Sequence, residues 1–330
     1  MKLYKYTKFD VGCSILESSH IALSKPEWFN DPFDCIPVFD KDEQLRAIEI
    51  LSGYVMDQHV IQLLQSLKNK TTKKRERILV SAVLKEFDFI RCLTRIRPSV
   101  YEPYCTFKIL KRMMSFLKFI GKTSPEHSVL VEKINFAQST LETQGTTMIS
   151  DMFNMRNRMY VGCLSDTYES ILMWSYYGDD HKGVCLEIEI DENSEYLSKV
   201  HYKNERPTMQ TEKLLRNFCG QLFANNDQKE ANALMLPLIL QPYITKAEGW
   251  QHEKEYRLIY FEEAFEKEGI FKKLCNDGTE RYMCPVKITK VYLGAAMSDE
   301  QKSEILSIIP SEIEVVEMNI SDTKYELLTH

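Results

Sequence analysis

The sequence predicts an α+β protein in which a mixed β-sheet, formed by the two ends of the chain, carries a large helical insertion. Three observations support this: β-prone segments gather in residues 1–40 and 159–330, helical periodicity fills residues 41–158, and the composition is that of a protein with a core. Of the 330 residues, 44% are hydrophobic and 27% charged, which excludes disordered and collagen-like chains. This length suffices for one large domain or two ordinary ones.

The first forty residues combine two short strands with a helix and a turn. We expect a strand at 3–6, a helix at about 11–19 and a second strand at 21–23. The segment KPEWFNDPFDC then places Pro, Asn and Asp among aromatic side chains. Asn and Asp bond neighbouring backbone amides, and proline keeps the residue before it out of the helical region. This segment should therefore hold a fixed, irregular conformation.

Residues 41–158 show apolar side chains at helical spacing and little alternation. The spacing is clear in Leu45–Val55, Leu79–Phe87 and Cys105–Phe116. A basic stretch, KNKTTKKRER, is predicted to be a loop between two of these helices. We interpret the block as a helical insertion or lobe, after which the sheet resumes.

The remaining strands are expected in residues 159–330. Tyr160–Ser165 is apolar and β-prone, and residues 183–190 alternate between apolar and polar side chains, which is typical of a half-buried strand. A third strand is expected at 253–261. Residues 288–320 predict a β–α–β unit, whose helix begins with a capping box at Ser298–Gln301.

Several functional classes are disfavoured. No apolar run approaches the roughly 18 residues of a membrane-spanning helix, and the charged N-terminus has no signal core. Nine scattered cysteines fit neither a disulfide framework nor a zinc knuckle, so we expect a cytoplasmic protein with reduced thiols. We expect no metal, because His181, His201 and His252 lack the i, i+4 spacing of helical ligands. Phosphate-loop, dinucleotide and esterase glycine motifs are absent.

The charge of the chain is unevenly distributed. Residues 68–122 contain 15 Lys and Arg against 4 Asp and Glu, a net charge of +11, so the remainder carries −17 of the total of −6. Such asymmetry can mark a surface for nucleic acid or another acidic partner. The alternative is a set of solvated helix faces, since no nucleic-acid module signature is present.

The sharpest candidate site is the pair Glu253 and Glu255. Residues i and i+2 of a strand point to one face, so the two carboxylates should stand side by side, with Arg257 next along. Their repulsion should raise one pKa unless a cation intervenes. Such a pair can bind a ribose hydroxyl and remove a proton from a nucleophile. The alternative is a Glu–Glu–Arg ladder on the surface of an edge strand.

A second candidate combines a strand that ends in Ser165 with an aromatic helix that contains Trp174 and Tyr177. A small polar group beside ring planes suits a flat ligand. The alternative is that both rings are core residues of an ordinary helix, capped by Asp166 or Ser170.

A third candidate is Tyr4-Lys5-Tyr6 on the first strand. Lys5 could meet a phosphate or pyrophosphate, and a tyrosine could stack on a ligand. The alternative is a solvent-facing lysine between two buried tyrosines.

Four motifs together resemble a widespread bacterial family of unknown function, some of whose members are associated with abortive phage resistance. They occur in the order of that family and cover both ends of the chain but not residues 41–158. The motifs are LYKY at 3–6, FNDPFD at 29–34, CLSD…ILMWSYYGDDHKGVCLE at 163–187 and W…EKEYRLIY at 250–260.

More loosely, the layout resembles ADP-ribosyltransferases, particularly the bacterial toxins that modify DNA. Those proteins order their site as an N-terminal strand with a polar residue, a middle strand and a late strand with the catalytic glutamate. Here these would be 3–6, 160–165 and the E-x-E of Glu253 and Glu255. Many relatives have His or Arg on the first strand, where this chain has Tyr4-Lys5-Tyr6. The resemblance implies a split mixed β-sheet core and NAD as the substrate.

The same resemblance implies a role for each candidate residue. Glu255 would bond the ribose 2′-hydroxyl and stabilise an oxocarbenium-like state, and Glu253 would orient or deprotonate the acceptor. The nicotinamide would lie against Trp174 and Tyr177 and bond Ser165, while Lys5 or Arg257 would neutralise the pyrophosphate.

Two functions therefore stay open. The protein is either an NAD-consuming transferase that acts as a phage-defence effector on a nucleic acid or protein, or a non-catalytic sensor or partner-binding component of a defence system. Nicotinamide release from NAD that is lost in Glu255→Gln would distinguish the first from the second.

Overall fold

A computed structural model describes residues 1–70, 73–103, 139, 145–274 and 278–329, which fall into two units. The sheet unit comprises Met1–Ile36, Met155–Arg206 and Tyr243–His330, and the helical unit comprises Pro37–Asn154 and Pro207–Pro242. The predicted insertion at 41–158 corresponds to the first segment of the helical unit, Pro37–Asn154, but omits its second segment, Pro207–Pro242. That second segment contains two helices, and the first of them packs against the earlier helices of the unit.

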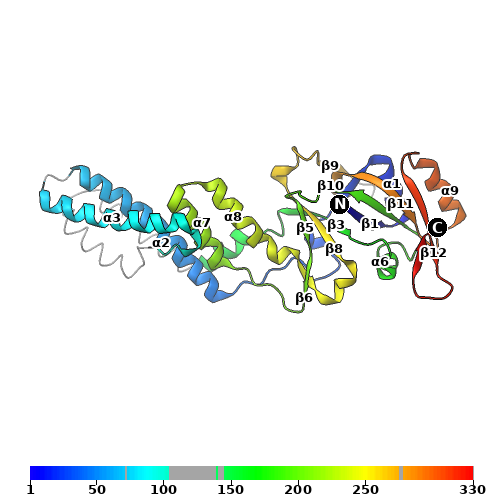
Figure 1. The fold of residues 1–330 in the computed structure, drawn as a ribbon, viewed down its shortest axis with the longest axis horizontal. Coiled ribbons are helices and arrows are strands. Elements are labelled where there is room, and N and C mark those ends of the chain that lie inside the picture. The colour runs from blue at the N-terminus through cyan, green and yellow to red at the C-terminus, as the bar shows by residue number, and fades with distance from the viewer. Residues whose placement is uncertain (71–72, 104–138, 140–144, 275–277, 330) are drawn as a thin grey trace. The chain divides into compact units, whose positions relative to one another are not determined.

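The main sheet of the sheet unit is mixed and has eight strands, in the order β13-β12-β11-β4-β1-β3-β8-β5 (Figure 1). β11 and β12 pair in parallel, as the predicted β–α–β unit requires, and the other neighbours pair antiparallel. The strands are β1 (Lys2–Thr7), β3 (Met159–Ser165), β4 (Val184–Glu189), β5 (Leu197–Lys199), β8 (Glu255–Phe261), β11 (Lys287–Leu293), β12 (Glu314–Ile320) and β13 (Leu327–Thr329).

Smaller elements complete the sheet unit. A three-stranded sheet has the order β2-β10-β9, and β6 pairs with β7 in parallel. These strands are β2 (His20–Leu23), β6 (His201–Lys203), β7 (Thr245–Ala247), β9 (Phe271–Leu274) and β10 (Glu280–Pro285). The helices are α1 (Phe9–Ser18), α6 (Ile171–Tyr176) and α9 (Asp299–Ile308). The predicted capping box of α9 is confirmed, with Ser298 and Gln301 bonding each other's backbone amides.

The main sheet is opened in its middle. β1 pairs with β4 along its whole length, and β3 pairs in the same way with β8. In contrast, β1 and β3 share the single register pair Tyr4–Ser165. The two strands therefore diverge on one side of that pair, and their facing backbones are not joined by a full ladder.

Both faces of the main sheet carry buried side chains. Leu186 and Ile188 belong to an apolar cluster that includes residues of α1 and α9, while Cys185 belongs to a second cluster around Trp174. Burying each large aliphatic side chain contributes roughly 1.5–3 kcal/mol. The prediction that residues 183–190 form a half-buried strand is wrong, because Cys185 and Glu187 are also buried. Aromatic packing covers Cys185, and an ion pair with Lys2 at 2.7 Å accommodates Glu187.

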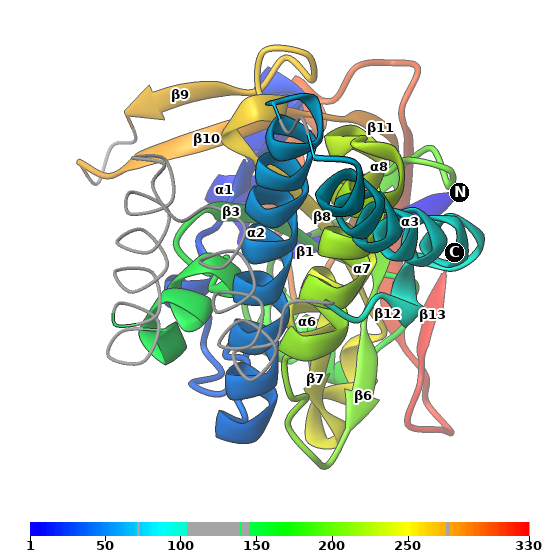
Figure 2. The ribbon, with the colours of Figure 1, turned by 90° about the vertical axis from the view of Figure 1, so that its left-hand side faces the viewer.

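The helical unit contains α2 (Lys41–Lys70), α3 (Lys74–Ile96), α7 (Thr211–Asn225) and α8 (Gln228–Leu240). The helices α2, α3 and α7 lie side by side (Figure 2). The basic stretch 68–77 does separate two helices, as predicted, but the loop is shorter than predicted, because α2 extends to Lys70 and α3 begins at Lys74. The predicted helix at 105–116 lies outside the described residues.

Part of the basic charge predicted as a partner surface is used inside the helical unit. Arg91 and Arg95, on α3, donate to the carbonyls of Phe223 and Ala224 at 3.1 and 3.2 Å. Those carbonyls end α7, where the helix dipole is negative, so the guanidinium groups stabilise that end. Within the described ranges, every helix is too short or too polar to cross a bilayer.

Candidate functional site

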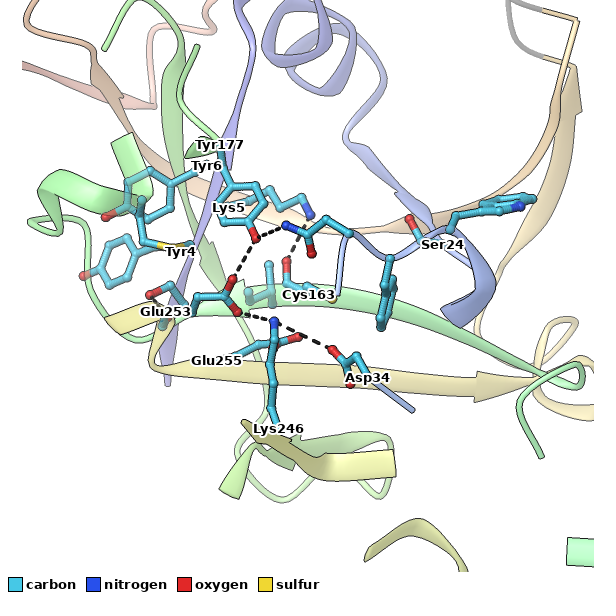
Figure 3. Close-up of a pocket in the computed structure, with 16 residues that line it drawn as sticks. Tyr4, Lys5, Tyr6, Ser24, Asp34, Cys163, Tyr177, Lys246, Glu253 and Glu255 are labelled. Carbon is cyan, nitrogen blue, oxygen red and sulfur yellow. Dashed lines mark hydrogen bonds and ion pairs between the residues drawn. The ribbon is translucent and has the colours of Figure 1, made fainter. Parts of the chain in front are cut away.

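A cavity of about 280 Å³ opens where β1 and β3 diverge (Figure 3). Its lining comes from five stretches that lie far apart in the sequence: β1, β3, residues 24–34, residues 173–177 and residues 246–255. All of them belong to the sheet unit. The cavity is at the lower end of the roughly 300–1,000 Å³ that small-molecule sites occupy.

The structure brings most of the predicted site residues to this cavity and leaves two outside its lining. Those that line it are Tyr4, Lys5, Tyr6, Ser165, Tyr177, Glu253 and Glu255. Trp174 is instead fully buried, donates its indole N–H to the carbonyl of Tyr168 at 2.8 Å and packs edge to face on Tyr6. Trp174 therefore packs behind Tyr6, which itself lines the cavity. Arg257 is likewise fully buried.

Strand register explains why three distant residues meet. Tyr4 is paired with Ser165, and Ser165 is paired with Glu255 on the next strand. Directly paired residues place their side chains on one face, so the three form a row across the sheet. The Ser165 hydroxyl donates to the carbonyl of Glu253 at 2.7 Å, which connects this row to the residue two positions before Glu255. Across the split, Lys5 Nζ donates to the carbonyl of Cys163 at 3.0 Å.

The two glutamates do not share a strand, contrary to the sequence prediction. Glu253 ends a 3₁₀ helix, η4 (Glu248–Glu253), and Lys254 has a left-handed φ of 44°, so β8 begins only at Glu255. A lysine brings the carboxylates together instead. Lys246 Nζ lies 2.5 Å from Glu253 Oε2 and 3.2 Å from Glu255 Oε2 (Figure 3).

Arg257 anchors Glu255 from behind the cavity. Its Nε lies 2.8 Å from Glu255 Oε1, and its two terminal nitrogens bind Asp34 at 2.6 and 3.0 Å. It also donates to the carbonyl of Tyr243 at 2.6 Å. Because these donors are directed at buried protein acceptors, the structure gives Arg257 the role of positioning Glu255.

The buried charges hold the two glutamates in different states. Burial alone would raise the pKa of Glu255, but Arg257 and Lys246 outweigh it and lower that pKa to about 2. Burial also raises the pKa of Glu253, and there the contact with Lys246 does not cancel the shift. Burial would lower the pKa of Lys246, yet Glu255, Glu253 and Asp34 raise it, so the ammonium stays charged. The sequence prediction was that repulsion would raise one pKa unless a cation intervened. The cation is present, since Lys246 contacts both carboxylates, and burial is the largest cause of the raised pKa of Glu253.

A hydrogen-bonded chain links Glu253 to the turn at 28–34. The Tyr177 hydroxyl donates to Glu253 Oε1 at 2.7 Å, and Asn30 donates to that hydroxyl at 3.1 Å. Burial and Glu253 raise the pKa of Tyr177, so the phenol keeps its proton. Tyr177 is thus a polar wall that fixes one oxygen of Glu253.

Sequence reasoning missed three residues of the site: Asn30, Asp34 and Lys246. Asn30 and Asp34 lie in the FNDPFD motif, so that motif was an available signal. Lys246 lies in no motif, and its role depends on a fold that lets a side chain of β7 reach Glu255 at the start of β8. Asp34 lies 3.7 Å from Lys246, so one ammonium meets three carboxylates. Among the described residues, no His, Cys, Asp and Glu side chains are grouped so as to hold a metal ion.

Comparison with known proteins gives a family match that covers part of this site. Residues 173–258 match a protein family described as "Protein of unknown function (DUF2971)". The matched segment contains Tyr177, both glutamates, Lys246 between them and Arg257 behind Glu255. No curated protein and no solved structure shows significant similarity to the chain.

Proposed function

We propose that the cavity binds the nicotinamide–ribose end of NAD and that the protein is an ADP-ribosyltransferase-like enzyme. The observation that carries this proposal is the convergence of the first strand, Ser165 and both glutamates on one cavity at a split in the sheet. These are the elements whose order resembles that of ADP-ribosyltransferases. The cavity has room for one end of NAD, so the rest of the dinucleotide would lie outside it.

The proposed reaction uses the difference between the two carboxylates. The bond from ribose C1′ to the nicotinamide nitrogen breaks, and its electron pair leaves with the nicotinamide. Glu255, ionised and held in place by Arg257, stabilises the positive charge that develops on the ribose. Its oxygens still have lone pairs for the ribose 2′-hydroxyl. Glu253, whose pKa is raised, takes the proton of the acceptor that attacks C1′.

The acceptor in this proposal is a nucleic acid or a protein, in keeping with a phage-defence effector. A hollow on α3 of the helical unit is lined by three basic side chains: Lys74, Arg77 and Lys85. Such basic side chains attract a phosphate backbone or an acidic protein surface.

The test is to incubate the full chain with NAD and to measure released nicotinamide. Glu255→Gln and Glu253→Gln should each lower the rate by about 10²–10³-fold, the loss typical of removing one group that stabilises transition-state charge. Glu189→Gln, on the exposed end of β4, is the matched control and should leave the rate unchanged. Absence of release from the wild-type protein would overturn the transferase.

A non-catalytic NAD-binding or partner-binding protein is the second candidate. It is favoured by the fact that Glu253 and Glu255 already have cationic partners within the protein. In that case NAD would raise the melting temperature without releasing nicotinamide. If NAD neither releases nicotinamide nor raises the melting temperature, both the NAD-consuming enzyme and the non-catalytic NAD-binding protein are excluded.

A further inference from the structure

A second cavity of about 300 Å³ lies in the sheet unit, beside the three-stranded sheet. It combines three aromatic rings with three basic side chains: Trp28, Tyr160 and Tyr282, and Lys25, Lys272 and Arg281. Cross-strand pairing explains the grouping, because Tyr282 of β10 is paired with Leu23 of β2 on one side and with Lys272 of β9 on the other.

The aromatic side of this cavity is rigid at its base and open at its wall. Tyr160 and Tyr282 pack edge to face with ring centroids 4.6 Å apart, and both contact Phe265. Trp28 belongs to the short 3₁₀ helix η1 (Pro26–Trp28), and half of its surface is exposed. An indole left half in water, at the wall of a cavity, offers a plane for stacking a flat ligand.

The charged side of the cavity has a surplus of one positive charge. Glu280 forms an ion pair with Lys272, and Glu262 accepts a hydrogen bond from the Tyr160 hydroxyl at 3.0 Å. Lys25 Nζ lies 5.7 Å from the centroid of the Tyr160 ring. In the part of the chain that the structure describes, Lys25 has no acidic partner, so its ammonium is available to an anion beside the aromatic wall.

We propose that this second cavity is a binding site for a nucleotide with one phosphate, whose base stacks on Trp28 and whose phosphate meets Lys25. A flat ring and a single anionic group satisfy both sides of the cavity together. The carboxylate of Glu262 and the hydroxyl of Tyr160 supply polar groups for the edge of the base. The inference does not depend on NAD chemistry in the first cavity.

Trp28 also borders the first cavity, so the same indole lies beside both sites. A ligand that holds the Trp28 ring in one cavity therefore changes the surface that this ring presents to a ligand in the other cavity. Any such effect must be reciprocal, because the coupling free energy between two binding sites is a single quantity.

The experiment is calorimetric titration of the full chain with adenosine 5′-monophosphate, adenosine and inorganic phosphate. We expect the monophosphate to bind more tightly than either of the other two. Trp28→Ala and Lys25→Ala should each weaken its binding by about tenfold, the range expected for a stacked ring or a charged contact. Lys8→Ala, an exposed lysine beside α1, is the control and should bind as the wild type does.

Two outcomes of these titrations would overturn the proposal, and a further variant, Glu255→Gln, supplies a third. One is equal binding of the monophosphate and inorganic phosphate, which would reveal an anion site without base recognition. The other is wild-type affinity in both Trp28→Ala and Lys25→Ala, with unchanged melting temperatures as the check on folding. Glu255→Gln locates the binding, because it should leave the monophosphate affinity unchanged if the second cavity is the site. Loss of affinity in that variant would place the ligand in the first cavity and would also contradict the proposal.

Discussion

Two regions of the main sheet are stabilised by different interactions. At the β11–α9–β12 end, buried Val291, Leu293 and Ile305 form an apolar core, and the ion pair of Lys302 with Glu317 lies at the surface. Where β8 begins beside the end of β3, the buried groups are charged instead: Arg257 and Lys246 against Asp34, Glu253 and Glu255. The first region is stabilised by burial of apolar surface. In the second, removing charged groups from water costs free energy, and the ion pairs hold those groups in a fixed arrangement.

The largest expected effect is that of Arg257→Met. This change leaves Asp34 and Glu255 buried without their guanidinium, which typically costs about 3–5 kcal/mol of unfolding free energy. Lys302→Met, in the apolar region, removes a surface ion pair and should cost less than about 1 kcal/mol. Urea denaturation of both variants gives the comparison. Equal losses of unfolding free energy in the two variants would show that the buried charge network contributes no more to stability than a surface ion pair.

Glu255→Gln should have the next largest effect, about 1–3 kcal/mol at neutral pH, because Arg257 and Lys246 lose a charged acceptor. The folded protein holds the pKa of Glu255 at about 2, below its ordinary value of 4.5. Its stabilising contribution is therefore complete above pH 4.5 and is lost as the pH falls toward 2. The stability difference between wild type and variant should shrink over that interval. A difference that is constant with pH contradicts the predicted shift.

A smaller effect is expected for Ser298→Ala, at the start of α9. The variant loses the capping box and should be destabilised by about 1 kcal/mol. Ser303→Ala, within the same helix, is the control, because its hydroxyl only bonds the carbonyl of Asp299 one turn earlier. Thermal unfolding of the two variants measures the difference. If the two melt alike, the cap contributes nothing beyond packing.

The same contrast explains which features could be predicted from the sequence. The β–α–β unit was predictable because its signals are local: a cap at Ser298, helical spacing and two β-prone runs. The charged site depends on pairs such as Asp34 with Arg257, which lie 223 residues apart. No spacing rule reveals such a pair, and the prediction therefore assigned Arg257 to a ligand.

The placement of Glu253 shows the same limit of sequence-based prediction, here over only the three residues 253–255. Strand periodicity predicted that Glu253 and Glu255 would be neighbours on one face. The left-handed turn at Lys254 ends that periodicity, and the carboxylates meet through Lys246 of another strand. The convergence on one cavity was predictable only through the order of the motifs, whereas the position of Lys246 required the fold.

The smallest expected effect, Glu253→Gln, sharpens the comparison inside the site itself. Burial raises the pKa of Glu253, so its ionised form is the disfavoured one in the folded protein. Its favourable contribution is complete below the unfolded pKa and is lost as the pH rises through the folded value, opposite in direction to Glu255. Glutamine retains an acceptor for Tyr177, and Lys246 retains two carboxylates, so the cost at neutral pH should be below about 1 kcal/mol.

Measuring the stability of Glu253→Gln from pH 4 to pH 8 tests this sign, with Glu189→Gln as an exposed control. Relative to the variant, the wild-type protein should lose stability as the pH rises. If it gains stability instead, both glutamates behave as ordinary ion-paired carboxylates. Glu253 would then be a weaker base than the proposed transfer reaction requires, even though the cavity and its fixed charge at Glu255 remained.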